Sequence, residues 1–128
     1  RQRQMCIRDS ISVSSVTACE NALIATGFPY EIASRVDEIL ERMRPVLSSC
    51  QGVRRCGAAA LDLAWTACGR FDAFYEDELK PWDMAAGALL VTEAGGSISN
   101  LDGSPFDLRW SILAGNKAMH ELIGKMIR

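Results

Sequence analysis

Histidine is nearly absent from this sequence, and its cysteines lack the spacing of a metal site. His120 is the only histidine, and the five cysteines form no CxxC pair. A zinc site or a Ser-His-Asp triad is therefore not expected, because the first needs several closely arranged ligands and the second needs a histidine base. Any catalysis by this chain must rest on carboxylates.

Long apolar runs and an excess of charge of one sign are also missing. No stretch approaches the roughly 20 apolar residues that cross a bilayer, and the polar first residues lack the pattern of a signal peptide. The formal net charge is −2 and the pI is about 5.4, so the charge does not favour nucleic acid or a membrane as a partner. Scattered cysteines in odd number are typical of reduced thiols, and we expect a cytoplasmic protein.

The first ten residues have no structural pattern of their own. The chain begins with Arg1, and the segment RQRQMCIRDS shows neither helical nor strand periodicity. It resembles a translated sequencing adapter more than natural protein. We therefore expect residues 1–10 to be a non-native leader and residues 11–128 to form one domain.

Apolar periodicity divides that domain into alternating strands and helices. Apolar residues between 32 and 43 recur at helical spacing and predict an amphipathic helix that ends at Pro45, and Pro81 and Gly95 bracket another helix. Such alternation predicts an α/β layered domain, with a parallel or mixed sheet and flanking helices. The predicted strands are 18–26, 53–56, 70–76 and 110–114, with extended pieces in 97–108, and the predicted helices are 31–45, 57–69, 81–94 and 117–127.

Carboxylates gather around the junction between the third strand and the third helix. Asp83 lies in the first turn of the helix that Pro81 opens, where the helix dipole favours a negative charge. Ligands of α/β sheets bind beyond the carboxyl ends of strands, and Glu76 and Asp83 flank such an end. The residues alone leave two interpretations of Asp83 open, a functional carboxylate or an ordinary helix N-terminal one.

Several separated segments indicate a known family. The stretch WDMAAGALLVTEAGG (82–96) resembles the second signature of the inositol monophosphatase family. The likeness extends over residues 16–128 and implies the C-terminal α/β domain of that sugar phosphatase fold. The other matching segments, in order, are NALIATGFPY (21–30), RRCGAAALDLAW (54–65), FDAFYEDELKPWD (71–83), SPFDL (104–108) and ILAGN (112–116).

The resemblance implies a role for each matching residue. Members of the family use two or three Mg²⁺ ions to hydrolyse a phosphate monoester. Asp83 matches a metal-binding aspartate, and Glu76 matches the glutamate that hydrogen-bonds substrate hydroxyls. Gly57, Ala58 and Ala59 match the helix start that lies against the substrate. Ala58 replaces a position that often carries a hydroxyl, and Lys80 stands where some members have histidine, so one substrate contact and the polyol selectivity are open.

The rest of the family's metal site has no counterpart here. It needs a glutamate pair and an Asp-Pro-x-Asp-Gly segment, and no stretch of this chain resembles either. We expect the chain to lack the N-terminal catalytic half and to be inactive alone. The complete protein is expected to be a homodimeric, Mg²⁺-dependent phosphatase of inositol monophosphate or a similar small polyol phosphate.

Two alternatives to this function stay open. The chain could belong to a sibling phosphatase that acts on histidinol phosphate, fructose bisphosphate or phosphoadenosine phosphate. It could also be a free-standing binding or regulatory domain without catalysis. Elsewhere the sequence predicts structural roles only: Asp62 is expected on the polar side of its helix, and Trp65, Trp82 and Trp110 are expected in the core.

Overall fold

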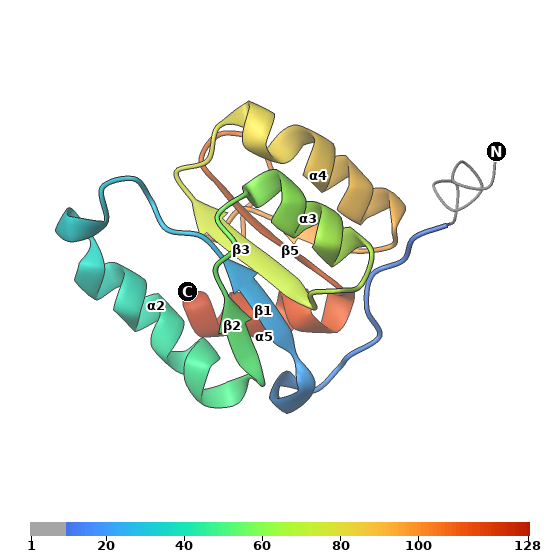
Figure 1. Ribbon diagram of the computed structural model, residues 1–128, viewed down its shortest axis with the longest axis horizontal. Helices are drawn as coiled ribbons and strands as arrows, with labels where there is room; N and C mark the ends of the chain where they lie inside the picture. Colours follow the sequence, from blue (N-terminus) through green and yellow to red (C-terminus); the bar gives the residue numbers. More distant parts are fainter. Residues whose placement is uncertain (1–9) are drawn as a thin grey trace.

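The computed structural model describes residues 10–128 (Figure 1). The leader expected at residues 1–10 thus lies, apart from Ser10, outside the described residues. The strands are β1 (Leu23–Thr26), β2 (Gly52–Arg54), β3 (Ala73–Asp77), β4 (Ser97–Ser99) and β5 (Ser111–Gly115). The helices are α2 (Val36–Ser49), α3 (Ala59–Ala67), α4 (Pro81–Glu93) and α5 (Lys117–Ile127), with short 3₁₀ turns at Cys19–Asn21 and Ile32–Ser34.

The five strands form one mixed sheet in the order β2-β1-β3-β5-β4. β1 lies parallel to both β2 and β3, whereas β5 is antiparallel to β3 and β4. The predicted α/β domain with a mixed sheet is confirmed. None of the helices within residues 10–128 combines the length and the apolar character that a membrane span requires.

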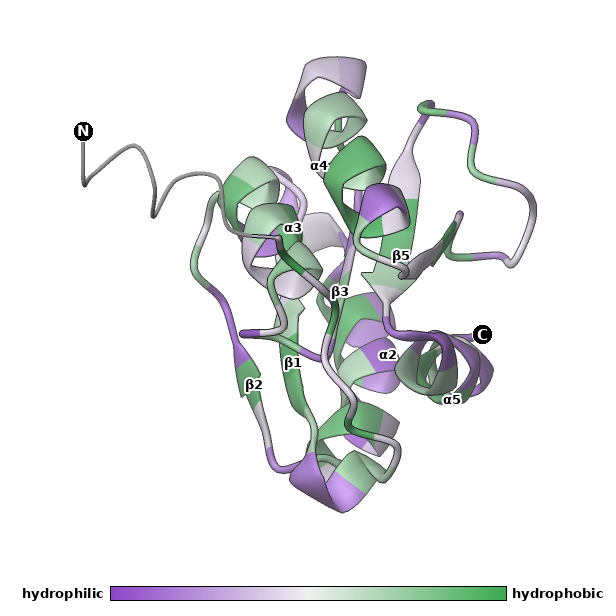
Figure 2. Ribbon diagram, turned by 90° about the vertical axis from the view of Figure 1, so that its right-hand side faces the viewer, coloured by the Kyte–Doolittle hydropathy of each residue, from purple (hydrophilic) through white to green (hydrophobic). Residues whose placement is uncertain are grey.

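Helices cover both faces of the sheet, and successive strand residues point to opposite layers. Ala25 of β1 and Phe74 of β3 belong to a core that includes Leu63 of α3 and Met84 of α4. Their neighbours Ile24 and Tyr75 belong to a second core, which α2 and α5 close with Val46 and Ile123 among others. Figures 1 and 2 show these two helix pairs around the sheet.

Proline does not end the first long helix, contrary to the prediction. Pro45 lies inside α2, which continues to Ser49. Val46, directly after the proline, is completely buried in the core. The last turn is also hydrogen-bonded, because the Cys50 N–H donates to the Val46 carbonyl at 2.9 Å. Tertiary packing thus outweighs the lost backbone donor of proline.

Two of the three tryptophans expected in the core are largely exposed. Trp82 is 77% and Trp110 is 62% exposed, whereas Trp65 packs edge-on against Phe71 with 5.7 Å between ring centres. Trp82 is one of the exposed large apolar residues of α3 and α4, which are together called the outer face of these helices. Figure 2 shows hydrophobic residues along α4. The outer face comprises Leu61, Trp82, Leu89 and Leu90.

Candidate functional site

One pocket contains all five residues that the sequence singled out. It has a volume of about 310 Å³ and lies at the edge of the sheet where the parallel strands β1 and β3 end. This is the edge at which α/β sheets bind their ligands. The predicted residues in its lining are Gly57, Ala58, Ala59, Glu76 and Asp83.

The N-terminus of α3 forms one side of the pocket. Gly57 has a φ of 86°, a left-handed conformation that glycine adopts without strain and that turns the chain into the helix. Ala58 is the N-cap, and α3 begins at Ala59. The first N–H groups of a helix have no carbonyl partner within it, and the methyl side chains here leave them accessible. Such a surface suits hydroxyl or phosphate oxygens.

Asp83 lies on another side, in the first turn of α4. Its Oδ2 accepts a hydrogen bond of 3.0 Å from the Lys80 N–H, and its own N–H donates to the Lys80 carbonyl at 2.9 Å. Asp83 therefore caps its helix. This agrees with one of the two interpretations that the sequence left open, an ordinary helix N-terminal carboxylate. The carboxyl group nevertheless remains partly exposed in the pocket, so the cap does not exclude a ligand role.

Glu76 supplies a pocket carboxyl group whose pKa is raised. Burial, together with the neighbouring carboxyl group of Asp62, raises the pKa of Glu76 to about 7, against the opposing effect of Arg55. The carboxyls of Asp77 and Asp83 act in the same direction as burial. A carboxyl group that titrates near neutrality can both donate and accept a hydrogen bond, which suits the recognition of a substrate hydroxyl.

Asp62 does not face solvent, contrary to the prediction. Asp62, in α3, is 1% exposed, and neither carboxylate oxygen has a geometrically defined hydrogen-bond partner among residues 10–128. Burial accordingly raises the pKa of Asp62. Asp62 shares the buried side of α3 with Leu63 and Thr66, whereas Leu61 is 53% exposed.

Arg55 is a pocket residue that the sequence reasoning missed. It lines the pocket, and its guanidinium lies 5.8 Å from the centre of the Phe28 ring. Arg55 therefore brings a positive charge to a lining that also carries four carboxylate residues, Glu76, Asp77, Glu78 and Asp83. The arginine pair that precedes Gly57 could have indicated it, because a cation next to a helix start is typical of anion-binding sites.

The described residues do not make a complete magnesium site. No group of three or more His, Cys, Asp or Glu side chains within residues 10–128 is arranged to hold a metal ion. Mg²⁺ requires near-octahedral coordination by oxygen, retains several waters, and is usually bound by one or two carboxylates together with substrate phosphates. Asp83 alone can supply one of these ligands.

Comparisons with known proteins found a matching family and similar sequences. The sequence matches the model of the inositol monophosphatase family over residues 1–128. An inositol-1-monophosphatase of Caulobacter vibrioides is 44% identical over 111 residues, which are 85% of this chain and 43% of that protein. The Nus factor SuhB of Pseudomonas aeruginosa is 48% identical over 109 residues, which are 83% of this chain and 40% of that protein.

A solved structure shows the same relationship in three dimensions. The inositol monophosphatase of Anabaena (Nostoc) superimposes with a TM-score of 0.88 at 37% identity. The alignment covers 94% of this chain and 48% of that one. The chain therefore spans less than half the length of each of these relatives.

Proposed function

Because this chain belongs to the inositol monophosphatase family, we propose that it forms the polyol-binding part of a phosphatase acting on inositol monophosphate or a similar small polyol phosphate. The observation that carries this proposal is the convergence of Glu76, Asp83 and the start of α3 on one pocket. These residues come from three separate elements, and the same five were singled out by their likeness to the family.

Each side of the pocket has a proposed role in binding. Glu76 hydrogen-bonds a substrate hydroxyl, and the N–H groups at the start of α3 receive ring or phosphate oxygens. Asp83 is one ligand of a Mg²⁺ site that the remainder of the complete protein would finish. Bound Mg²⁺ would stabilise the negative charge that develops on the phosphate ester.

Activity of the complete protein and of this chain tests the proposal. The complete protein is expected to release phosphate from inositol 1-phosphate only with Mg²⁺, and Asp83→Asn should lower kcat/KM by at least a hundredfold through loss of a metal ligand. The 128-residue chain is expected to release none. Phosphate release by the chain alone would contradict the proposed division of the site, and an inactive complete protein would contradict the proposed function.

A panel of substrates decides between the sibling phosphatases. Histidinol phosphate, fructose bisphosphate and phosphoadenosine phosphate differ in size and charge from inositol 1-phosphate. We propose inositol 1-phosphate as the preferred substrate, because the name of the Caulobacter relative states that specificity. A higher kcat/KM for another member of the panel would make that compound the preferred substrate instead.

A regulatory function is the second candidate. Its support is the 48% identical Pseudomonas relative, which is named as a Nus factor. Asp83→Asn in the complete protein separates the two functions, because regulation by binding should survive loss of a metal ligand and phosphatase activity should not. We further propose that the complete protein is cytoplasmic and forms a homodimer, and sedimentation of the complete protein would test the dimer.

A further inference from the structure

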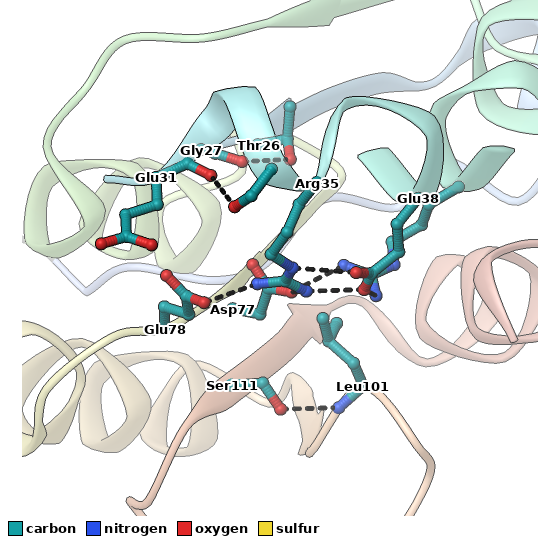
Figure 3. A network of polar contacts seen from close by, with 11 residues as sticks. Thr26, Gly27, Glu31, Arg35, Glu38, Asp77, Glu78, Leu101 and Ser111 are labelled. Atoms are coloured by element: carbon teal, nitrogen blue, oxygen red, sulfur yellow. Dashed lines mark hydrogen bonds and ion pairs between the residues drawn. The ribbon is translucent and has the colours of Figure 1, made fainter. Parts of the chain in front are cut away.

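Arg35 binds three carboxylates with one guanidinium group (Figure 3). Its Nε and one terminal nitrogen donate hydrogen bonds of 2.8 and 2.6 Å to the two carboxylate oxygens of Glu38. The same terminal nitrogen contacts Asp77 at 2.7 Å, and the other one contacts Glu78 at 2.7 Å. The Arg35 side chain is only 24% exposed and that of Asp77 only 15%. An isolated surface ion pair contributes little, whereas a bidentate, partly buried network restricts geometry.

The network connects two segments that line the pocket. Arg35 is the N-cap of α2, shortly after residues 27–32, most of which line the pocket. Asp77 ends β3 and Glu78 begins the connection to α4, and both also line the pocket. Arg42, further along α2, also contacts Asp77 at 3.0 Å and Glu38 at 2.9 Å.

Glu78 adopts a backbone conformation that needs support. Its φ is 57°, in the left-handed region that non-glycine residues rarely occupy. After Glu78, the Leu79 N–H donates a hydrogen bond of 3.0 Å to the Trp110 carbonyl. The Lys80 N–H donates one of 3.0 Å to Oδ2 of Asp83. The corner at Asp77 and Glu78 therefore determines how the strand carrying Glu76 is connected to the helix carrying Asp83.

We propose that Arg35 is a positioning residue for this pocket. By holding Asp77 and Glu78, it maintains the left-handed corner and with it the relative placement of Glu76 and Asp83. Arg35 itself does not line the 310 Å³ pocket, so it acts through the corner and not on the substrate. This inference rests on the proposed function, because it assigns a use to the spacing of those two carboxyl groups.

Kinetics of the complete protein provide the first test. Arg35→Gln should raise KM for inositol 1-phosphate about tenfold, and Arg35→Lys should do so less, since lysine keeps the charge but not the bidentate geometry. Arg44→Gln is the matched control, because Arg44 is exposed on the same helix and the charge change is identical. Glycine at residue 78 adopts the left-handed conformation unaided. In a Glu78→Gly background, Arg35→Gln should therefore change KM by no more than about twofold.

Hydrogen exchange provides a second test that does not depend on activity. In Arg35→Gln the amides of Leu79 and Lys80 should exchange about tenfold faster than in the wild type, and in Arg44→Gln they should be unchanged. If the wild type does not hydrolyse inositol 1-phosphate but this acceleration occurs, the proposed function fails and the positioning role stands. The proposal would be overturned if Arg35→Gln left the exchange of the Leu79 and Lys80 amides unchanged, or if its KM equalled that of Arg44→Gln.

Discussion

Gly27 lies directly against the carboxyl group of Glu76, so that a β-carbon built at residue 27 would overlap the Cδ and both oxygens of that side chain. The parallel pairing of β1 with β3 brings the two residues together at the strand ends. The location of the Glu76 carboxyl group in the pocket therefore depends on the absence of a side chain at its neighbour.

Gly27→Ala is expected to displace the Glu76 side chain and to cost about 1–3 kcal/mol of stability through overpacking. Chemical denaturation of the 128-residue chain measures this cost. Gly52→Ala is the matched control in the neighbouring strand, because a β-carbon there would meet only the side chains of Arg54 and Leu23, at 3.3 and 3.7 Å. Equal stability of the two variants would show that the Glu76 carboxyl group moves without cost.

Glu76 is expected to make the folded chain less stable as the pH rises. The unfolded chain releases this proton near pH 4.5 and the folded chain near pH 7, because burial and then Asp62 raise the pKa of Glu76. Between these values the folded state binds more protons, so the free energy of unfolding falls with increasing pH and stays at the lower value above pH 7. Glu76→Gln removes this contribution. Relative to wild type it should gain about 1–2 kcal/mol between pH 4.5 and 8, less than the full shift implies because solvent partly screens the carboxyl group.

The comparison needs denaturation curves of both proteins at matched pH values. Glu93→Gln serves as the control, because Glu93 is an exposed glutamate at the end of α4. A Glu76→Gln variant whose stability follows that of wild type across this range would contradict the raised pKa of Glu76.

Asp62 is expected to be a source of instability at neutral pH. Its carboxyl group is buried and neither oxygen has a hydrogen-bond partner among the described residues. Asp62→Asn keeps the shape and removes the charge, and it should stabilise the chain by about 1 kcal/mol. The same change should lower the pKa of Glu76, which NMR titration of the Glu76 carboxyl carbon would measure. A destabilised Asp62→Asn variant would contradict this prediction.

The apolar outer face of α3 and α4 is expected to drive association of the isolated chain. Leu61, Trp82, Leu89 and Leu90 are each between 41% and 77% exposed, and exposed apolar patches of this kind promote binding. We expect the chain to aggregate or to bind a hydrophobic dye. Leu61→Lys combined with Leu89→Lys should reduce both effects while leaving the circular dichroism spectrum unchanged. A monodisperse wild-type chain that binds no dye would contradict this role of the outer face.

The sequence by itself determined the order and type of the elements. Pro81 opens α4 and Gly95 follows its end, while the Asn116 side chain caps α5 by accepting the Met119 N–H at 2.9 Å. These signals are local, because each depends on backbone groups within a few residues of one another. Positions at a strand end and a helix start predicted Glu76 and Asp83 as site residues, and likeness to a family added Gly57, Ala58 and Ala59.

Only the tertiary structure decided which side chains are buried and which distant residues meet. Asp62 is buried and Trp82 exposed because α3 and α4 pack a particular face on the sheet, and an apolar period does not choose between two faces that both carry apolar residues. The contact of Arg35 with Glu78 joins residues 43 positions apart. Such a contact follows from the pairing of β1 with β3 and the placement of α2, and no local preference of the chain encodes it.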